Sequence, residues 1–425
     1  MRLARVVVFT AIFVTAFGFY VEHGVRDGGL AAAPEPGDGH DYDALAFNLW
    51  RHHRFGYAWD DPEWRRPYIG NTFYMPLLSR RGAYYPTTYR QPATPATMAL
   101  VYTVTNRSFA AWRLASCALT AGGVVAAAAT AALLAGLPAA VVTAALVLLL
   151  PLPTMFSYLF MTESLALFLV ALLAWRWTIA ARAGWTTASA VGSGVVLGAL
   201  MCTRSIFILF LPLAFIVPAG NRRTGAVRPI VLNRTACVLA ALLVAGPWWV
   251  RNCLVLHALM PFGTQGALNI PAGFGPAAVE HSGLWLPIAT DAAVRDIEAR
   301  HLDPVSTEVA IARARSSATR TWVSTHPGGA LRLAWLHVWQ EIKPRDEPTP
   351  TGAWLLPAAI VAAIVLWRRQ GVFVIVWMTA VNIAAIAATW SVGGRFMLPV
   401  QPILAALVGA AAADLTRRLY ADARA

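Results

Sequence analysis

Charged residues are scarce in this chain. Asp, Glu, Lys and Arg together make up 13% of its 425 residues, whereas 58% are hydrophobic, and the mean hydropathy is +0.56. Soluble globular domains carry about 25% charged residues, so this composition excludes an ordinary water-soluble domain. Several apolar runs reach the roughly 20 residues that a helix needs to cross about 30 Å of hydrocarbon. We therefore expect an all-α, multi-pass membrane protein.

Lysine is almost absent, because Lys343 is the only one in the chain. The net charge of +13 comes from arginines, and many of these stand at the ends of apolar runs. Such a placement orients helices in a membrane and neutralises anionic headgroups. It argues against a protein that binds nucleic acid, although the chain is basic.

Cysteine is also rare. The chain has four cysteines, and Cys117, Cys202 and Cys237 fall inside apolar runs, where cysteine behaves as a small hydrophobic residue. Cys253 lies just beyond such a run. This pattern excludes a disulfide framework and leaves the redox compartment open.

The apolar runs predict about ten membrane-spanning helices in a single domain that covers residues 1–425. Two long hydrophilic segments, 23–109 and 251–352, interrupt the series. The expected spans are residues 5–22, 110–135, 138–158, 163–181, 187–203, 205–220, 235–250, 353–367, 372–390 and 396–413.

The first run has a second interpretation, as a cleaved signal peptide. Arg2 and Arg5 precede it, and the segment 31–33 consists of alanines that suit a cleavage site. An uncleaved first span agrees better with the rest of the chain, for the reasons given below.

Arginine clusters at the ends of the expected spans predict the topology. Alternating crossings place all the clusters on one side, which the positive-inside rule assigns to the cytoplasm. A single helix over 187–220 would be about 50 Å long, too long for one crossing, so we expect a hairpin with Arg204 at its outer tip. Both long loops then face the periplasm or exterior of a plasma (bacterial inner) membrane. The clusters are Arg2 and Arg5, Arg176 and Arg182, Arg222, Arg223 and Arg228, Arg368 and Arg369, and Arg417 and Arg418.

Each long loop contains an amphipathic helical pattern. In the first loop the apolar stripe is Tyr42, Leu45, Ala46, Leu49 and Trp50, and the second half of that loop is expected to be irregular. Helices of this kind, with tryptophan in the stripe, lie along the membrane interface. The stripe of the second loop is Leu331, Ala334, Trp335, Val338, Trp339 and Ile342.

Six charged residues, far apart in sequence, converge on the outer face in this topology. Charges at the rim of apolar spans are costly and call for a partner or a task. Arginine offers bidentate, permanently charged donors, so the set suits an anionic lipid phosphate whose tail stays in the bilayer. Each arginine alone has the simpler explanation of a side chain that snorkels at a helix end. The six are Asp38, Arg90, Glu163, Arg204, Arg251 and Arg395.

Several segments resemble, in the same order, the motifs of the GT-C glycosyltransferases that use polyprenyl-phosphate sugars. The chain is most similar to the branch with bacterial aminoarabinose transferases and protein O-mannosyltransferases. In that superfamily an Asp follows the first span, with a Tyr four residues later, and the first span is not cleaved. The matching segments are Asp38 to Leu49, Tyr89 to Pro95, Met161 to Ser164, Gly198 to Arg204, Pro247 to Asn252 and Arg395 to Pro402.

The chain departs from that pattern in two ways. Gly39 stands where the family frequently has an acidic residue. The extra C-terminal domain of the longer members is expected to be missing, which leaves the acceptor open as a lipid, a glycan or a protein.

The resemblance implies an inverting transfer of a sugar from a lipid-phosphate donor. Asp38 would be the catalytic base, or would bind the acceptor through a divalent metal ion, with His40 and Asp41 as further possible ligands. One carboxylate suffices, because a phosphate leaves already ionised and needs electrostatic stabilisation rather than a general acid. The implied substrate-binding residues are Tyr42, Arg90, Glu163, Arg204, Arg251 and Arg395.

The sequence leaves some alternatives open. Glu163 has the purely structural explanation of a salt bridge to Arg204 or Arg251. A non-catalytic transporter, flippase or binding protein for an anionic polyprenyl lipid would use the same arginines without chemistry, and a scaffold subunit is a third class. Asp43 is expected to point to water beside the apolar stripe, and therefore to matter less than Asp38.

Overall fold

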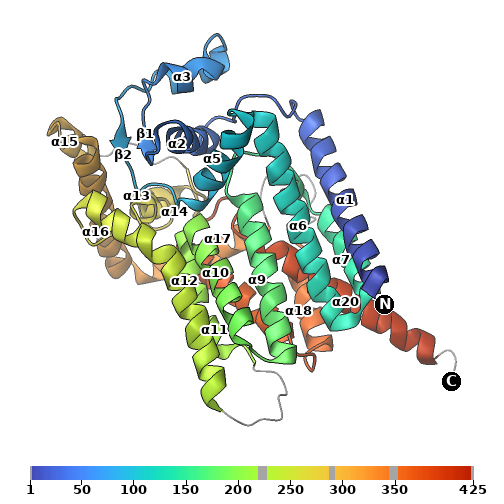
Figure 1. The fold of residues 1–425 in the computed structure, drawn as a ribbon. Helices are drawn as coiled ribbons and strands as arrows, with labels where there is room; N and C mark the ends of the chain where they lie inside the picture. Colours follow the sequence, from blue (N-terminus) through green and yellow to red (C-terminus); the bar gives the residue numbers. More distant parts are fainter. Residues whose placement is uncertain (1, 219–226, 287–291, 344–352, 423–425) are drawn as a thin grey trace.

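The computed structural model describes residues 2–218, 227–286, 292–343 and 353–422. Apolar helices form the body of the protein (Figure 1). Among the described residues, five helices are long and apolar enough to cross a membrane: α1 (Arg2–Arg26), α6 (Phe109–Ala135), α9 (Glu163–Ala183), α12 (Val227–Leu256) and α20 (Gln401–Asp422), which the short turn η5 (Leu398–Val400) precedes. Shorter helices between them are α7 (Leu137–Leu148), α8 (Pro151–Phe156), α10 (Thr187–Thr203), η3 (Ser205–Phe210), α11 (Leu213–Ile216), α18 (Leu355–Val365) and α19 (Val372–Ala387).

In the described part of the chain, each segment expected to span the membrane overlaps one or two of these apolar helices, and the segment 138–158 is divided between α7 and α8. The segment 205–220 is helical only in short pieces, η3 and α11, which lie within a single apolar stretch. Apolar side chains on α1 and α12 face outward, with Leu243 75% exposed, as expected where lipid replaces water. The chain is a multi-pass membrane protein. The number of crossings stays a prediction.

Small residues allow the helices to pack closely. Gly194 and Gly198 stand four residues apart on α10, so they share one face of the helix. That face lies against α12, and a Cβ on either glycine would collide with the α12 backbone or with the side chains of Ala240 and Val244. Membrane helices associate through such small-residue contacts, because lipid gives no hydrophobic force between helices.

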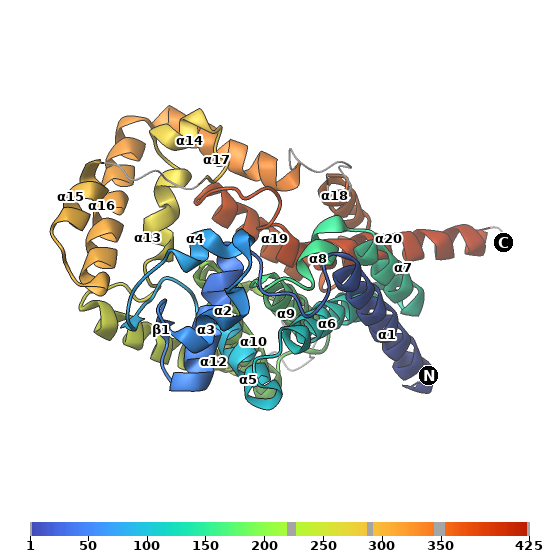
Figure 2. The ribbon, with the colours of Figure 1, turned by 90° about the horizontal axis from the view of Figure 1, so that it is seen from above.

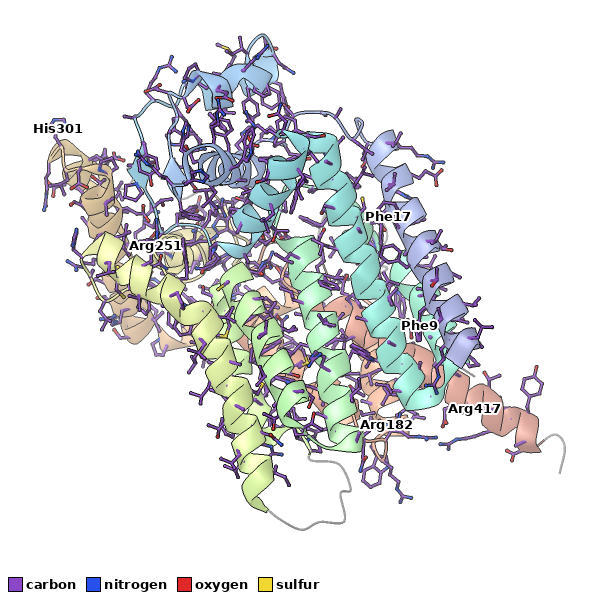
Figure 3. All side chains as sticks on the ribbon, viewed as in Figure 1. Phe9, Phe17, Arg182, Arg251, His301 and Arg417 are labelled. Atoms are coloured by element: carbon purple, nitrogen blue, oxygen red, sulfur yellow. The ribbon has the colours of Figure 1, made fainter. Side chains whose placement is uncertain are left out.

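The two ends of the molecule differ. Figure 3 shows Arg251 and His301 at one end, together with both long loops, and Arg182 and Arg417 at the other. We refer to the first as the loop end. This arrangement agrees with the sequence-based separation of loops from arginine clusters. Arg222 and Arg223 lie outside the described residues.

The first loop folds over the loop end. It contains α2 (Asp38–His52) and α5 (Ala93–Thr105), and between them only short elements, as expected for an irregular segment. These are β1 (Gly56–Tyr57), α3 (Pro62–Arg65), η1 (Arg66–Tyr68), η2 (Thr72–Tyr74), α4 (Met75–Leu78) and β2 (Tyr85–Pro86), and β1 pairs with β2 in antiparallel orientation.

The expected apolar stripe of α2 is covered by protein rather than by the membrane. The position of α2 along the membrane interface stays a prediction. Tyr42, Leu45 and Ala46 are buried, because α2 packs against α5 on one side and the aromatic side chains of the first loop on the other. Amphipathic periodicity shows which face is apolar, but it does not show whether protein or lipid covers that face.

The second loop forms an arc of helices beside the first (Figure 2). Its members are α13 (Gln265–Asn269), η4 (Ile270–Ala272), α14 (Pro276–Glu280), α15 (Ala292–Ala299), α16 (Pro304–Thr325) and α17 (Pro327–Ile342). On α17 the expected apolar stripe is partly open, with Leu331 exposed and Trp335, 64% exposed, stacked on Trp339. This is the surface that an interfacial helix offers to a membrane. Contact with the membrane itself stays a prediction.

Candidate active site

Asp38, the first residue of α2, lies between two arginines from distant parts of the chain. Its Oδ1 accepts a hydrogen bond from Arg90 Nη2 at 2.5 Å, and its Oδ2 is 3.0 Å from Arg395 Nη1. The carboxylate remains 27% exposed, whereas both guanidinium groups are largely buried. The structure therefore joins three of the expected site residues directly.

These ion pairs set the charge of Asp38. Burial by itself would raise the pKa of its carboxyl group, but the adjacent guanidinium groups of Arg90 and Arg395 outweigh burial and hold that pKa well below its usual range. Asp38 is consequently ionised at neutral pH. While both arginines hold it, it is also a weak base.

Arg90 has further partners in the first loop. Asp41 Oδ2 lies 2.8 Å from Arg90 Nη2 and also accepts from its Nε. The guanidinium carbon stands 5.1 Å from the centre of the Tyr42 ring and 4.7 Å from that of Tyr89. These contacts hold Arg90 independently of Asp38.

Glu163, the first residue of α9, continues the chain of charges on the other side. Its fully buried carboxylate forms ion pairs with Arg395 and, at 2.5 Å, with Arg204 at the end of α10. The salt bridge to Arg204 that the sequence left open is therefore present, whereas one to Arg251 is not.

Together these contacts form a line of alternating charges, Asp41–Arg90–Asp38–Arg395–Glu163–Arg204, which we call the charge line. Its six members have a formal net charge of zero, and Arg80 adds a fourth guanidinium group, which pairs with Asp41 at 3.2 Å. The members come from α2, the segment before α5, the start of α9, the end of α10 and the segment before η5. Only the tertiary fold brings these segments together.

Arg251 does not belong to the charge line. It donates hydrogen bonds to the backbone oxygens of Thr87 and Phe55, at 2.7 and 2.9 Å, and its guanidinium group stacks on the Trp248 ring. The expectation that it holds phosphate alongside Arg395 is not supported by these contacts. It braces the first loop.

Comparison with known proteins gives matches to solved structures alone, since no family model and no curated protein matches the chain. The oligosaccharyltransferase AglB from Archaeoglobus fulgidus, in complex with an inhibitory peptide and a dolichol-phosphate, matches over 98% of this chain and 51% of its own, with 12% identity and a TM-score of 0.55. The same enzyme tethered to an acceptor peptide with the NVT sequon matches with 14% identity and a TM-score of 0.54 over 94% and 49% of the two chains. ArnT from Cupriavidus metallidurans, bound to undecaprenyl phosphate, has 14% identity and a TM-score of 0.44 over 95% and 76%.

The chain has the GT-C fold. It spans about half the length of the AglB chains that it matches. The residues of the charge line stand at or next to helix ends. The fold brings these helix ends together at the loop end, which explains where the charge line lies.

The expectation that the Asp43 side chain points to water is wrong. Its carboxylate is fully buried and binds Arg107 Nη2 at 2.6 Å, the hydroxyls of Tyr68 and Tyr102 at 2.7 Å, and Trp64 Nε1 at 2.9 Å. An acidic side chain one position from an apolar stripe turns inward when polar partners from other segments surround it. Asp43 therefore holds the first loop together.

The described residues contain no group of three or more His, Cys, Asp or Glu side chains that are placed to hold a metal ion. His40, a possible ligand by sequence, packs edge-on against the rings of Tyr68 and Tyr74 instead. Burial lowers its pKa, so its imidazole is neutral. The carboxylates of Asp38 and Asp41 are both bound by Arg90. These residues do not fit a preformed metal site.

Two carboxylates of the second loop, the partly buried Glu308 and the buried Glu341, were not predicted from the sequence. Glu308 on α16 accepts hydrogen bonds from the hydroxyls of Thr87, Thr88 and Thr264, and Glu341 on α17 binds the segment that carries Arg395. Burial raises the pKa of both groups. The local sequence does not distinguish a buried glutamate of this kind from a solvent-exposed glutamate on a helix.

Proposed function

We propose that this protein is an inverting membrane glycosyltransferase that transfers a sugar from a polyprenyl-phosphate donor to a cell-envelope acceptor. The observation that carries the proposal is the position of Asp38 between Arg90 and Arg395. A carboxylate that can serve as a base stands directly beside two guanidinium groups of the kind that suits phosphate. The GT-C fold supports this assignment, since AglB, solved with a dolichol-phosphate, shares it.

The donor phosphate takes the place of Asp38 on the two arginines. Arg90 keeps Asp41 and Arg395 keeps Glu163 during the exchange, so neither guanidinium group loses all its partners. Phosphate oxygens suit the bidentate guanidinium donors. Once released, the carboxylate of Asp38 loses the interaction that lowers its pKa, and its basicity rises.

Asp38 then takes the proton of the acceptor hydroxyl. The acceptor oxygen forms its bond to the anomeric carbon as the bond from that carbon to the phosphate oxygen breaks. The phosphate keeps the electron pair, and Arg90 and Arg395 stabilise its charge. Attack from the side opposite the leaving group inverts the configuration. General base catalysis of this type contributes about 10²- to 10⁴-fold.

No step is assigned to a metal ion, because the residues at the site do not fit one. We assign the other binding roles from the contacts of each residue. Tyr42 lies under Arg90 and lines the donor side, while Glu163 and Arg204 fix the orientation of Arg395. The loop end faces the exterior or periplasmic side of a plasma (bacterial inner) membrane, and the acceptor is a lipid, a glycan or a protein.

The proposal is tested by mass spectrometry of envelope lipids and glycans from cells with the gene, without it, and with Asp38→Asn in its place. We expect one glycosylated product to vanish in the deletion and to stay absent with Asp38→Asn. Normal product with the variant would instead favour a lipid transporter or binding protein, which needs no base. Loss of activity with a chelator, reversed by Mn²⁺, would overturn the metal-free step.

A further inference from the structure

Glu341, near the end of α17, is a buried carboxylate that binds four donors. Its Oε1 accepts from the Ser391 hydroxyl at 3.0 Å and the Val392 amide at 2.6 Å. Its Oε2 accepts from the amides of Phe396 and Met397 at 2.7 and 3.2 Å. In the described part of the chain, no ion pair joins Glu341 to a cation.

These four donors flank Arg395 on both sides. The connecting segment 391–397 leaves α19, turns at Gly393 and Gly394 with φ of 65° and 90°, and leads into η5. Both φ values are in the left-handed region, where glycine is favoured. Arg395 is thus presented at the tip of a turn whose two ends are bound to a single side chain.

Other contacts tie the same turn to the second loop and to α19. The Trp285 amide donates to the Ser391 oxygen at 2.9 Å, and Asn382 Nδ2 donates to the Phe396 oxygen at 3.1 Å. Neither contact reaches both ends of the turn. Among these three residues, Glu341 alone joins residues before Arg395 to residues after it.

The four contacts require a carboxylate rather than an amide. Both oxygens of Glu341 accept, whereas glutamine has one accepting oxygen and an NH₂ group that only donates. In glutamine, that NH₂ group would face two donors in a buried site. Burial raises the pKa of Glu341, and the four donors offset part of that rise.

We propose that Glu341 is a positioning residue of the phosphate site, which fixes the turn 391–397 so that Arg395 reaches the donor phosphate. This inference rests on the proposed function. It assigns the second loop a share in donor binding, although no side chain of α17 belongs to the charge line. Glu341 acts through Arg395 and does not touch the substrate.

The test compares Glu341→Gln with Gln340→Met. Gln340 is an equally buried neighbour on α17 that donates a hydrogen bond to Ser282 rather than to the turn, so its replacement measures general damage to the helix. Binding of undecaprenyl phosphate to the full-length protein in detergent is measured against undecaprenol, which lacks the phosphate. We expect Glu341→Gln to weaken phosphate-dependent binding roughly tenfold or more, and Gln340→Met to leave it near wild type.

A double-mutant cycle separates positioning from structural support. In an Arg395→Ala background, Glu341→Gln should cause no further loss, because the group through which it acts is gone. Equal losses in both backgrounds, or unchanged binding in Glu341→Gln, would overturn the inference. Amide hydrogen exchange at Val392, Phe396 and Met397 should speed up in Glu341→Gln alone. If that variant does not fold, Ser391→Ala removes one donor and should show the same effects to a smaller degree.

Failure of the proposed function gives a different result. Wild-type protein that binds undecaprenyl phosphate no better than undecaprenol would overturn the phosphate site itself. Hydrogen exchange would then still decide whether Glu341 fixes the turn, because that measurement needs no ligand. In that case, faster exchange in Glu341→Gln would show that Glu341 holds the turn. The turn would nevertheless have no role in phosphate binding, so the inference would also be overturned.

Discussion

Asp38→Asn should change phosphate binding and turnover in opposite directions. Asp38 occupies the guanidinium groups of Arg90 and Arg395 that the donor phosphate has to reach. Replacement by asparagine removes the competing charge and keeps the size of the side chain. The variant should therefore bind undecaprenyl phosphate more tightly while it loses the base.

The size of the gain follows from the contacts. A hydrogen bond to a charged group contributes about 1.5–3 kcal/mol. Asp38 is 27% exposed, and solvent screens its ion pairs, so the lower end of this range applies. Loss of one such contact, about 1.5 kcal/mol, corresponds to roughly tenfold tighter binding. Turnover should fall by about 10² or more without the base.

The assay measures both quantities on the same preparations. Native mass spectrometry gives the bound fraction of undecaprenyl phosphate, with undecaprenol as reference. Product formation in membranes from a deletion strain gives the rate. Asp60→Asn is the matched control, because it removes one exposed carboxylate from the same loop, and Asp60 contacts Arg65 and Arg81 rather than the charge line.

Folding should survive, since Arg90 retains Asp41 and Arg395 retains Glu163. The lowered pKa of Asp38 also fixes the pH dependence. The contribution of the ionised Asp38 carboxylate to the free energy of unfolding is fully present above its ordinary pKa of 3.8. This contribution is lost only as the pH falls below that value. The difference in unfolding temperature between wild type and variant should thus be the same at pH 5 and pH 7.

Weaker phosphate binding in Asp38→Asn would refute the competition between Asp38 and the donor phosphate for the two arginines. Turnover within threefold of wild type would refute the catalytic role of Asp38.

Three further predictions concern the neighbouring residues and the orientation. Asp43→Asn should destabilise the protein by about 3–5 kcal/mol, because it leaves a buried arginine without its charge partner; unfolding in denaturant measures this, and a loss of activity at full stability would contradict it. Arg395→Lys should weaken binding of undecaprenyl phosphate about tenfold to a hundredfold through loss of the bidentate donor, whereas Arg251→Lys should leave it unchanged, and equal effects would return Arg251 to the phosphate site. In a cysteine-free background, an impermeant thiol reagent added to cells should label Ala58→Cys in the first loop and not Ala188→Cys at the start of α10, and the reverse result would invert the proposed orientation.

Part of the site followed from sequence because topology depends on local hydropathy. Spans at known positions fix which ends of helices face the same side, and this is sufficient to place Asp38, Arg90, Glu163 and Arg395 at one face. The same reasoning placed Arg251 in the site as well. From sequence, an arginine at the outer end of a helix cannot be assigned either to a binding site or to hydrogen bonds with a loop, because the two cases have the same local pattern. Which carboxylate meets which guanidinium group depends on the approach of segments far apart in sequence.

The sequence alone determined the class of the protein and the position of its apolar helices. In lipid, each helix satisfies its own backbone hydrogen bonds, so composition over about 20 residues decides whether it forms. Only the tertiary structure decided the fate of single polar side chains. Asp43 is buried and Glu341 binds a distant turn because side chains and amides from other segments supply the hydrogen bonds that water would otherwise make. The stripe of α2 faces protein rather than lipid for the same reason, since the partner that covers it lies elsewhere in the chain.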